Sequence, residues 1–204
     1  GAFDHSEWRN TLLLTADDAK NGVVDDHTEH TTKQEGVSRM IDMLTESIGY
    51  RWSQKKVYLL DYDVDAAGQK RQAAQDFLNI LNQGALITTY FGHGSKTDWA
   101  GEGLLKPSYL SRVNNKGRYT ILNSFSCAVG RFDEGGKRSL SEEFLIAPDA
   151  GSIISVGAAR ETYEVYNELL GRNFVLNLLS TPGITIGDAF VKAKKVRRQD
   201  ESLF

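Results

Sequence analysis

The sequence is short of cysteine, of net charge and of long apolar runs. It has one cysteine in 204 residues, which excludes an internal disulfide. The net charge of −3 at pH 7 gives no electrostatic reason to expect nucleic acid as a partner. No apolar run approaches the ~20 residues that a membrane-spanning helix needs. Internal repeats, low-complexity linkers and a phosphate-binding glycine loop are absent as well.

What is present is the composition of an ordinary globular domain. Hydrophobic residues make up 40% of the chain and charged residues 25%. A chain of this length can bury a substantial core without disulfides or structural metal. The first five residues contain no start methionine and no signal-peptide pattern, so we expect residues 1–204 to be part of a longer protein.

Strand-like and helix-like segments alternate along the whole chain. Short apolar runs predict strands at 11–15, 57–60, 85–91, 119–126 and 152–156. Apolar residues at helical spacing predict helices at 31–49, 69–83, 108–113, 139–146, 165–179 and 187–198. Ser139 and Glu142, three residues apart, predict a capping box. The strands are apolar on both faces, which indicates an α/β fold with a mostly parallel sheet flanked by helices.

Two chemically reactive side chains follow neighbouring predicted strands. His93, in a Gly-His-Gly-Ser turn, comes after strand 85–91, and Cys127 comes after strand 119–126. Because parallel strands end at the same edge of a sheet, we expect these residues to form a nucleophile pair. A histidine lowers the ordinary thiol pKa of about 8.5 and later protonates a leaving amine. The N–H groups of Gly94 and Cys127 are predicted to form an oxyanion hole.

A non-catalytic alternative stays open on pattern alone. Lone cysteines are usually buried and inert. In that case the chain is a flavodoxin-like α/β scaffold or binding domain, with Cys127 in the core and the glycine-flanked His93 as a plain turn.

Three segments together resemble the gingipain-like cysteine peptidases. They are Tyr90–Ser95, Asn123–Gly130 with Phe132 nearby, and the later stretch 141–158. The resemblance implies a caspase-like three-layer sandwich, with residues 1–204 as a single gingipain-type catalytic subdomain. It also implies peptide-bond cleavage by Cys127 with His93, without a cofactor.

Within that family, Ser-Cys-Ala-Val-Gly-Arg-Phe-Asp at 126–133 is similar to the sortase-like peptidases of the type IX secretion system of Bacteroidetes. That resemblance implies removal of the C-terminal signal of secreted cargo proteins. It implies transfer of the acyl group to an amine of anionic lipopolysaccharide. Other secretion-system components are the implied partners, and the outer membrane or cell surface is the implied location.

The resemblance also implies supporting acidic residues. An acidic residue after the first strand assists the histidine in gingipains, and Asp17 or Asp18 stands there. A later acid reads the side chain before the cut, and Asp25 or Asp26 falls near that place. A carboxylate bonded to imidazole would fix its tautomer and favour the imidazolium ion.

Other residues on the same predicted edge are weaker candidates. Trp99 either walls the site or packs in the core, and Arg160 with Glu161 either contact substrate or form a surface ion pair. The acidic and histidine cluster at 25–30 and the aspartates at 61–65 lack the remaining ligands of a zinc site or an EF-hand. We therefore expect no metal at the site, while surface calcium, as in gingipains, is compatible with the sequence.

Overall fold

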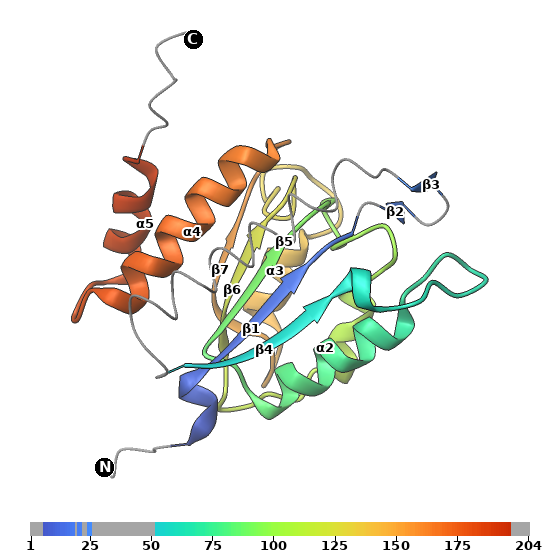
Figure 1. Ribbon diagram of the computed structural model, residues 1–204, viewed down its shortest axis with the longest axis horizontal. Helices are drawn as coiled ribbons and strands as arrows, with labels where there is room; N and C mark the ends of the chain where they lie inside the picture. The colour runs from blue at the N-terminus through green and yellow to red at the C-terminus, as the bar shows by residue number, and fades with distance from the viewer. Residues whose placement is uncertain (1–5, 19, 22–23, 26–51, 197–204) are drawn as a thin grey trace, which may run out of the picture.

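Five parallel strands form the central sheet of the computed structural model, which describes residues 6–18, 20–21, 24–25 and 52–196 (Figure 1). The strands of this sheet are β1 (Thr11–Ala16), β4 (Ser53–Tyr58), β5 (Ile87–Phe91), β6 (Thr120–Phe125) and β7 (Ser152–Gly157). A separate antiparallel pair consists of β2 (Lys20–Asn21) and β3 (Val24–Asp25). The described helices are α2 (Arg71–Gln83), α3 (Leu140–Ile146), α4 (Glu164–Ser180) and α5 (Ile186–Lys194), with short 3-10 turns at Glu7–Asn10, Leu59–Asp61 and Pro107–Arg112.

The order of the strands creates one reversal point in the sheet. The order is β4-β1-β5-β6-β7, so the chain runs outward from β1 to β4 and then returns to the other side of β1. Ala16 pairs with Phe91, and Phe91 pairs with Phe125. Three neighbouring strands therefore end at one level, at the edge where open α/β sheets bind their ligands.

Helices cover both faces of the sheet (Figure 1). Along β1, Leu13 packs in one buried cluster with side chains of α2 and α3, whereas Leu12 and Leu14 pack in a second cluster with side chains of α4 and α5. This alternation follows from the two-residue period of a strand. The sandwich of helix, sheet and helix layers that the sequence predicted is confirmed.

The helix boundaries have local causes. On α2, Ala73, Phe77 and Leu81 recur at helical spacing and are fully buried. This helix ends at Gly84, whose φ of 105° lies in the region that favours glycine. The predicted capping box of α3 is confirmed: the Ser139 hydroxyl accepts from the Glu142 N–H, and the Glu142 carboxylate accepts from the Ser139 N–H.

Most predicted elements lie where the sequence placed them. The second strand is the exception, because β4 occupies 53–58 and residues 59–61 form a 3-10 turn. Its first four residues are at least partly exposed at the sheet edge, so they carry no apolar signal. The predicted helix at 31–49 falls outside the described residues. Within the described ranges, none of the helices combines the length and apolar character that crossing a bilayer requires.

Candidate active site

Three residues with reactive or acidic side chains lie at the carboxyl edge of the sheet because of the strand register. Asp17 follows the last residue of β1 directly, while His93 and Cys127 each stand two residues beyond the paired Phe91 and Phe125. The strands β1, β5 and β6 are direct neighbours, about 4.8 Å apart by the usual spacing. The chain topology therefore brings an acid, a base and a thiol into one row.

Asp17 holds His93 through two contacts to one oxygen. Its Oδ2 accepts a hydrogen bond from the His93 backbone N–H at 2.8 Å and lies 3.1 Å from Nδ1 of the ring. The Asp17 side chain is 1% exposed, whereas the His93 side chain is 40% exposed. A buried carboxylate against Nδ1 favours the tautomer that carries its proton on Nδ1 and leaves Nε2 unprotonated. It also favours the imidazolium ion.

Asp18 has a different partner. Lys70, itself buried, forms a short ion pair with Asp18 Oδ2 and donates to the Leu59 carbonyl oxygen at 2.6 Å. The Asp18 N–H donates to Asp17 Oδ1 at 2.9 Å. Of the two acids that the sequence left as alternatives, the structure brings Asp17 to the imidazole and assigns Asp18 to the lysine. A third buried carboxylate, Glu102, lies within 4.8 Å of both.

Two glycines allow the loops at this edge to touch. A Cβ on Gly92 would lie 2.2 Å from the Asp17 Cβ, and φ at Gly92 is 155°. A Cβ on Gly94 would lie 2.6 Å from Ser126 Oγ and 2.8 Å from the Cys127 carbonyl oxygen. The backbone after His93 therefore packs directly against the backbone that carries Cys127.

Cys127 is a free, partly exposed cysteine, and the hydrogen bonds of its sulfur are to one residue, Thr162. The Thr162 N–H donates to Sγ at 3.3 Å, Thr162 Oγ1 lies 3.8 Å from Sγ, and the thiol is 3.5 Å from the Thr162 carbonyl oxygen. Asn167 Nδ2 donates in turn to Thr162 Oγ1 at 2.8 Å. This polar environment differs from the apolar core that the non-catalytic alternative requires.

The backbone next to Cys127 is strained. Ala128 has φ of 58°, in the left-handed region that non-glycine residues rarely adopt. Its N–H donates to the Arg160 carbonyl oxygen at 3.0 Å, which ties the turn to the segment after β7. Within the described part of the chain, the N–H groups of Gly94 and Cys127 donate to no other group.

Of the two alternatives for Trp99, the structure shows packing in the core and excludes a wall of the site. Its side chain is fully buried and stacks on Tyr90 with ring centroids 4.5 Å apart. The indole N–H donates to Ser124 Oγ at 3.0 Å. Tyr90 donates to the His93 carbonyl oxygen at 2.7 Å, and burial followed by the Asp17 charge raises the pKa of Tyr90 well above its usual value. Trp99 thus supports the residue that holds the histidine backbone, and it cannot contact a substrate.

Arg160 and Glu161 form exposed ion pairs with the loop after Cys127. Arg160 binds Asp133 with both of its terminal nitrogens, at 2.9 and 2.6 Å, and lowers the pKa of Asp133 to about 2. Arg131 Nη2 lies 2.9 Å from Glu161 Oε1. These pairs join the two loops, and their contact with a substrate stays a prediction. Asp26 lies outside the described residues.

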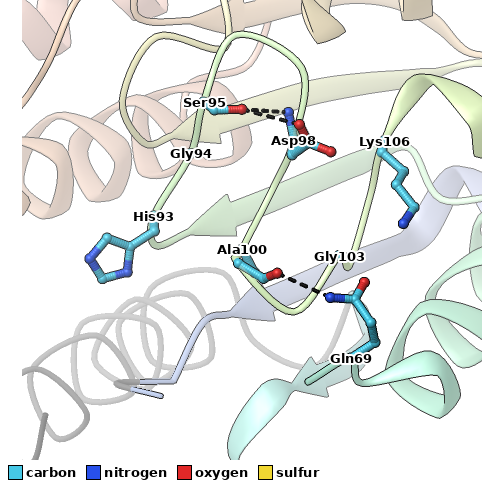
Figure 2. Close-up of a pocket in the computed structure, with 9 residues that line it drawn as sticks. Gln69, His93, Gly94, Ser95, Asp98, Ala100, Gly103 and Lys106 are labelled. Carbon is cyan, nitrogen blue, oxygen red and sulfur yellow. Dashed lines mark hydrogen bonds between the residues drawn. The ribbon is translucent and has the colours of Figure 1, made fainter. Parts of the chain in front are cut away.

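A hollow of about 500 Å³ lies beside His93 on the side of α2. Figure 2 shows Gln69 and Lys106 at one end of it, and the imidazole of His93 at the other end directed away from them. Cys127 is not among its lining residues.

Sequence reasoning missed Lys70, Tyr90 and Thr162. Lys70 reads as an ordinary polar residue in the first turn of the predicted helix 69–83, and Tyr90 reads as one more apolar residue in a strand. Thr162 stands 35 residues from Cys127, and its role depends on how the segment after β7 returns to the sheet edge. The one signal in the sequence was positional, because this segment also follows a strand of the same sheet.

Fold and site together define a caspase-like α/β domain with an acid, a histidine and a cysteine at the carboxyl edge of its sheet. A model of peptidase family C25 matches residues 2–202, so the chain belongs to that family of cysteine peptidases. A structure described as the Arg-specific cysteine proteinase gingipain R is 18% identical, with a TM-score of 0.72. That match covers 92% of this chain and 41% of the gingipain chain.

A second solved structure of a gingipain is also similar to this chain. The complex of the pro- and mature domains of Porphyromonas gingivalis RgpB matches with a TM-score of 0.65 at 18% identity, covering 93% of this chain and 44% of that one. No curated protein matches this sequence. The chain therefore spans less than half the length of the solved proteinases that it resembles, and at this identity they support the fold alone.

Proposed function

We propose that this chain is the catalytic part of a cysteine peptidase in which Cys127 is the nucleophile, His93 is the general base and acid, and Asp17 orients the histidine. The observation that supports the proposal is that all three residues follow neighbouring strands at one sheet edge, with Asp17 Oδ2 at 3.1 Å from the His93 ring nitrogen. Membership of peptidase family C25 supports the same chemistry.

The first half-reaction is an acyl transfer to sulfur. The Cys127 thiolate attacks the scissile carbonyl carbon, the C–S bond forms, and the C–N bond breaks as His93 gives its proton to the leaving amine. The hydrogen bond from the Thr162 N–H at 3.3 Å favours negative charge on the sulfur before the attack. The Asp17 carboxylate favours the imidazolium that donates the proton.

The oxyanion of the tetrahedral intermediate needs donors that are not already used. The N–H groups of Gly94 and Cys127 are suited to this role, because neither donates to another group in the described part of the chain. Losing one such donor typically slows a reaction by ~100- to 1000-fold.

In the second half-reaction, either water or an amine can accept the acyl group. Water or an amine attacks the thioester carbon, His93 takes the proton, and Cys127 leaves as thiolate. We propose that the acyl group is that of a cargo protein whose C-terminal type IX secretion signal is removed, and that an amine of anionic lipopolysaccharide accepts it at the cell surface. The resemblance of the motif at 126–133 supports this sortase-like role. Other components of the secretion system would be its partners.

Thiol labelling tests the nucleophile. Cys127 of the full-length protein should react with iodoacetamide rapidly at pH 6 to 7, and His93→Ala should slow that reaction about tenfold or more. The reactivity of an ordinary thiol, unchanged in His93→Ala, would contradict the proposal. Lys116→Ala, whose side chain is exposed and paired with Asp149, is the control.

Product mass tests the sortase-like role. A reporter fused to a C-terminal secretion signal is incubated with the enzyme, with and without an added amine. An expected product carries the amine in place of the signal, and Cys127→Ala gives no product. If the products contain only added water, whatever amine is present, the protein is a peptidase and the proposed transfer to an amine is refuted.

A further inference from the structure

Thr162 touches the sulfur of Cys127 with three different groups. Its backbone N–H donates to Sγ at 3.3 Å, its carbonyl oxygen lies 3.5 Å from Sγ, and its hydroxyl oxygen lies 3.8 Å from Sγ. The residue directly precedes Tyr163, the N-cap of α4, so a long helix fixes its position. These contacts require no substrate to form.

The direction of the Thr162 hydroxyl is set by Asn167. Asn167 stands in the first turns of α4 and donates its Nδ2 to Thr162 Oγ1 at 2.8 Å. A hydroxyl oxygen that accepts a hydrogen bond from an amide has its own proton free for another acceptor. Within the described residues, the side-chain hydrogen bonds of Thr162 are to Asn167 and Cys127 alone, which leaves Sγ as the acceptor.

The protonation state of the sulfur decides which Thr162 group it prefers. A neutral thiol donates its proton to the Thr162 carbonyl oxygen. A thiolate has no proton to donate, is repelled by that oxygen, and is stabilised by the N–H and the O–H. The same residue therefore offers a partner to the thiol and two donors to the thiolate.

We propose that Thr162 and Asn167 are positioning residues of the nucleophile: Asn167 turns the Thr162 hydroxyl proton toward Cys127, so that two donors of Thr162 stabilise the thiolate. This inference rests on the proposed function, because it assigns a role only if Cys127 reacts as a thiolate. This role differs from that of Asp17, because Asp17 acts on the imidazolium of His93, whereas Thr162 acts on the thiolate of Cys127.

The charged groups near Thr162 do not supply this stabilisation themselves. Arg160 is bound to Asp133, and Glu161 is bound to Arg131. Glu164 and Glu168, on the same helix, are acidic residues and supply no positive charge to a thiolate. From the neighbouring loop, His93 is the proposed proton acceptor of the thiol and acts on it from a different element. The contribution of Thr162 is therefore one of neutral donors.

The experiment follows the rate of Cys127 alkylation by iodoacetamide from pH 4 to 10 in the full-length protein. Thr162→Val removes only the hydroxyl and should lower the rate at pH 6 by roughly 5- to 10-fold, moving the midpoint of the profile upward by up to about one pH unit. Thr162→Ser should keep the wild-type profile. Thr181→Val, at the other end of α4, is the matched control and should change nothing.

Asn167 variants test the direction of the hydroxyl. Asn167→Asp places an acceptor where the donor stood, draws the Thr162 proton away from Sγ, and should slow alkylation at pH 6 at least as much as Thr162→Val. Asn167→Ala should have a smaller effect, because the hydroxyl is then free to rotate. With a peptide substrate, Thr162→Val should lower kcat and leave KM unchanged.

The outcomes separate the two proposals. If wild-type Cys127 reacts as an ordinary thiol and His93→Ala has no effect, the proposed function fails. If wild-type Cys127 is activated but Thr162→Val keeps its profile, the role of Thr162 is refuted. A wild-type profile in Asn167→Asp would refute the role of Asn167. Thermal unfolding of each variant checks that altered rates do not follow from loss of folding.

Discussion

Asp17 and His93 are joined through a single carboxylate oxygen that binds both the backbone and the ring of the histidine. Asp17 Oδ2 accepts from the His93 N–H at 2.8 Å and lies 3.1 Å from Nδ1. The backbone bond fixes the loop, and the ring contact fixes the tautomer. One buried side chain thus controls both the position of the histidine and the tautomer of its ring.

Asp17→Asn should abolish most of the activity while the protein stays folded. Because both contacts go to one oxygen, an amide NH2 at that place opposes the His93 N–H and favours the wrong tautomer of the ring, whereas an amide oxygen there lacks the charge that stabilises the imidazolium. We expect kcat/KM for peptide cleavage to fall by roughly 100- to 10,000-fold, as for other histidine-orienting acids. Asp76→Asn, which changes a carboxylate of α2 bound to Tyr62 and Gln72, is the control. Activity within a few fold of wild type would show that Asp17 does not orient the base.

The buried pair of Lys70 and Asp18 should behave as a unit in unfolding experiments. Both side chains are at most 3% exposed, and Asp18 Oδ1 has no hydrogen-bond partner in the described residues. Lys70→Met leaves a buried carboxylate unpaired and should lower the free energy of unfolding by about 3 to 5 kcal/mol. Adding Asp18→Asn removes that charge, so the double variant should regain much of the loss in urea denaturation. Equal stability of the single and double variants would contradict this coupling.

Trp99 should affect stability and leave substrate recognition alone. Trp99→Phe keeps a ring for the stack on Tyr90 but removes the donor to Ser124 Oγ, which is buried. An unsatisfied buried hydroxyl costs about 1 to 3 kcal/mol, and Ser124→Ala in the same chain should recover part of it. KM for a peptide should stay within about twofold of wild type. A large increase in KM would mean that Trp99 reaches the substrate after all.

The sequence predicted the layers of the fold because the signals for them are local. Runs such as Leu12–Leu14 and the spacing of Phe77 and Leu81 report burial directly, and the register follows once parallel strands pair. The partners inside the site were not predictable in this way. Lys70 meets Asp18 across 52 residues, and nothing in either neighbourhood encodes that distance. The role of Trp99 was ambiguous, because a tryptophan in a loop can either line the site or pack in the core.

Gly94 should be intolerant of any side chain because two loops meet there. An added Cβ would lie 2.6 Å from Ser126 Oγ and 2.8 Å from the Cys127 carbonyl oxygen. Gly94→Ala must push His93 away from Cys127, and a displacement near 1 Å costs about 100-fold in rate. Gly135→Ala, with no atom within 4 Å of its Cβ, is the matched control and should change kcat/KM little. Equal rates for the two variants would contradict close packing of the loops.

The capping box of α3 makes part of the stability depend on pH. The Ser139 backbone N–H, and then its hydroxyl, lower the pKa of Glu142. A carboxyl whose pKa is lower in the folded state stabilises the protein above its unfolded pKa of about 4.3, and the effect is lost as pH falls through the folded value. Ser139→Ala should cost about 1 kcal/mol at pH 7.

Glu142→Gln isolates the pH-dependent part. In urea denaturation, its stability should fall below wild type at pH 7, and the difference should shrink as pH falls through the lowered pKa of Glu142. Glu143→Gln is the control, since this neighbour lies in the same helical turn and has no part in the capping box. The consequence reaches the site, because the Leu140 N–H donates at 2.8 Å to the carbonyl oxygen of Lys96 in the loop that follows His93. A constant gap between wild type and Glu142→Gln from pH 7 to pH 3 would show that the capping carboxylate does not titrate with folding.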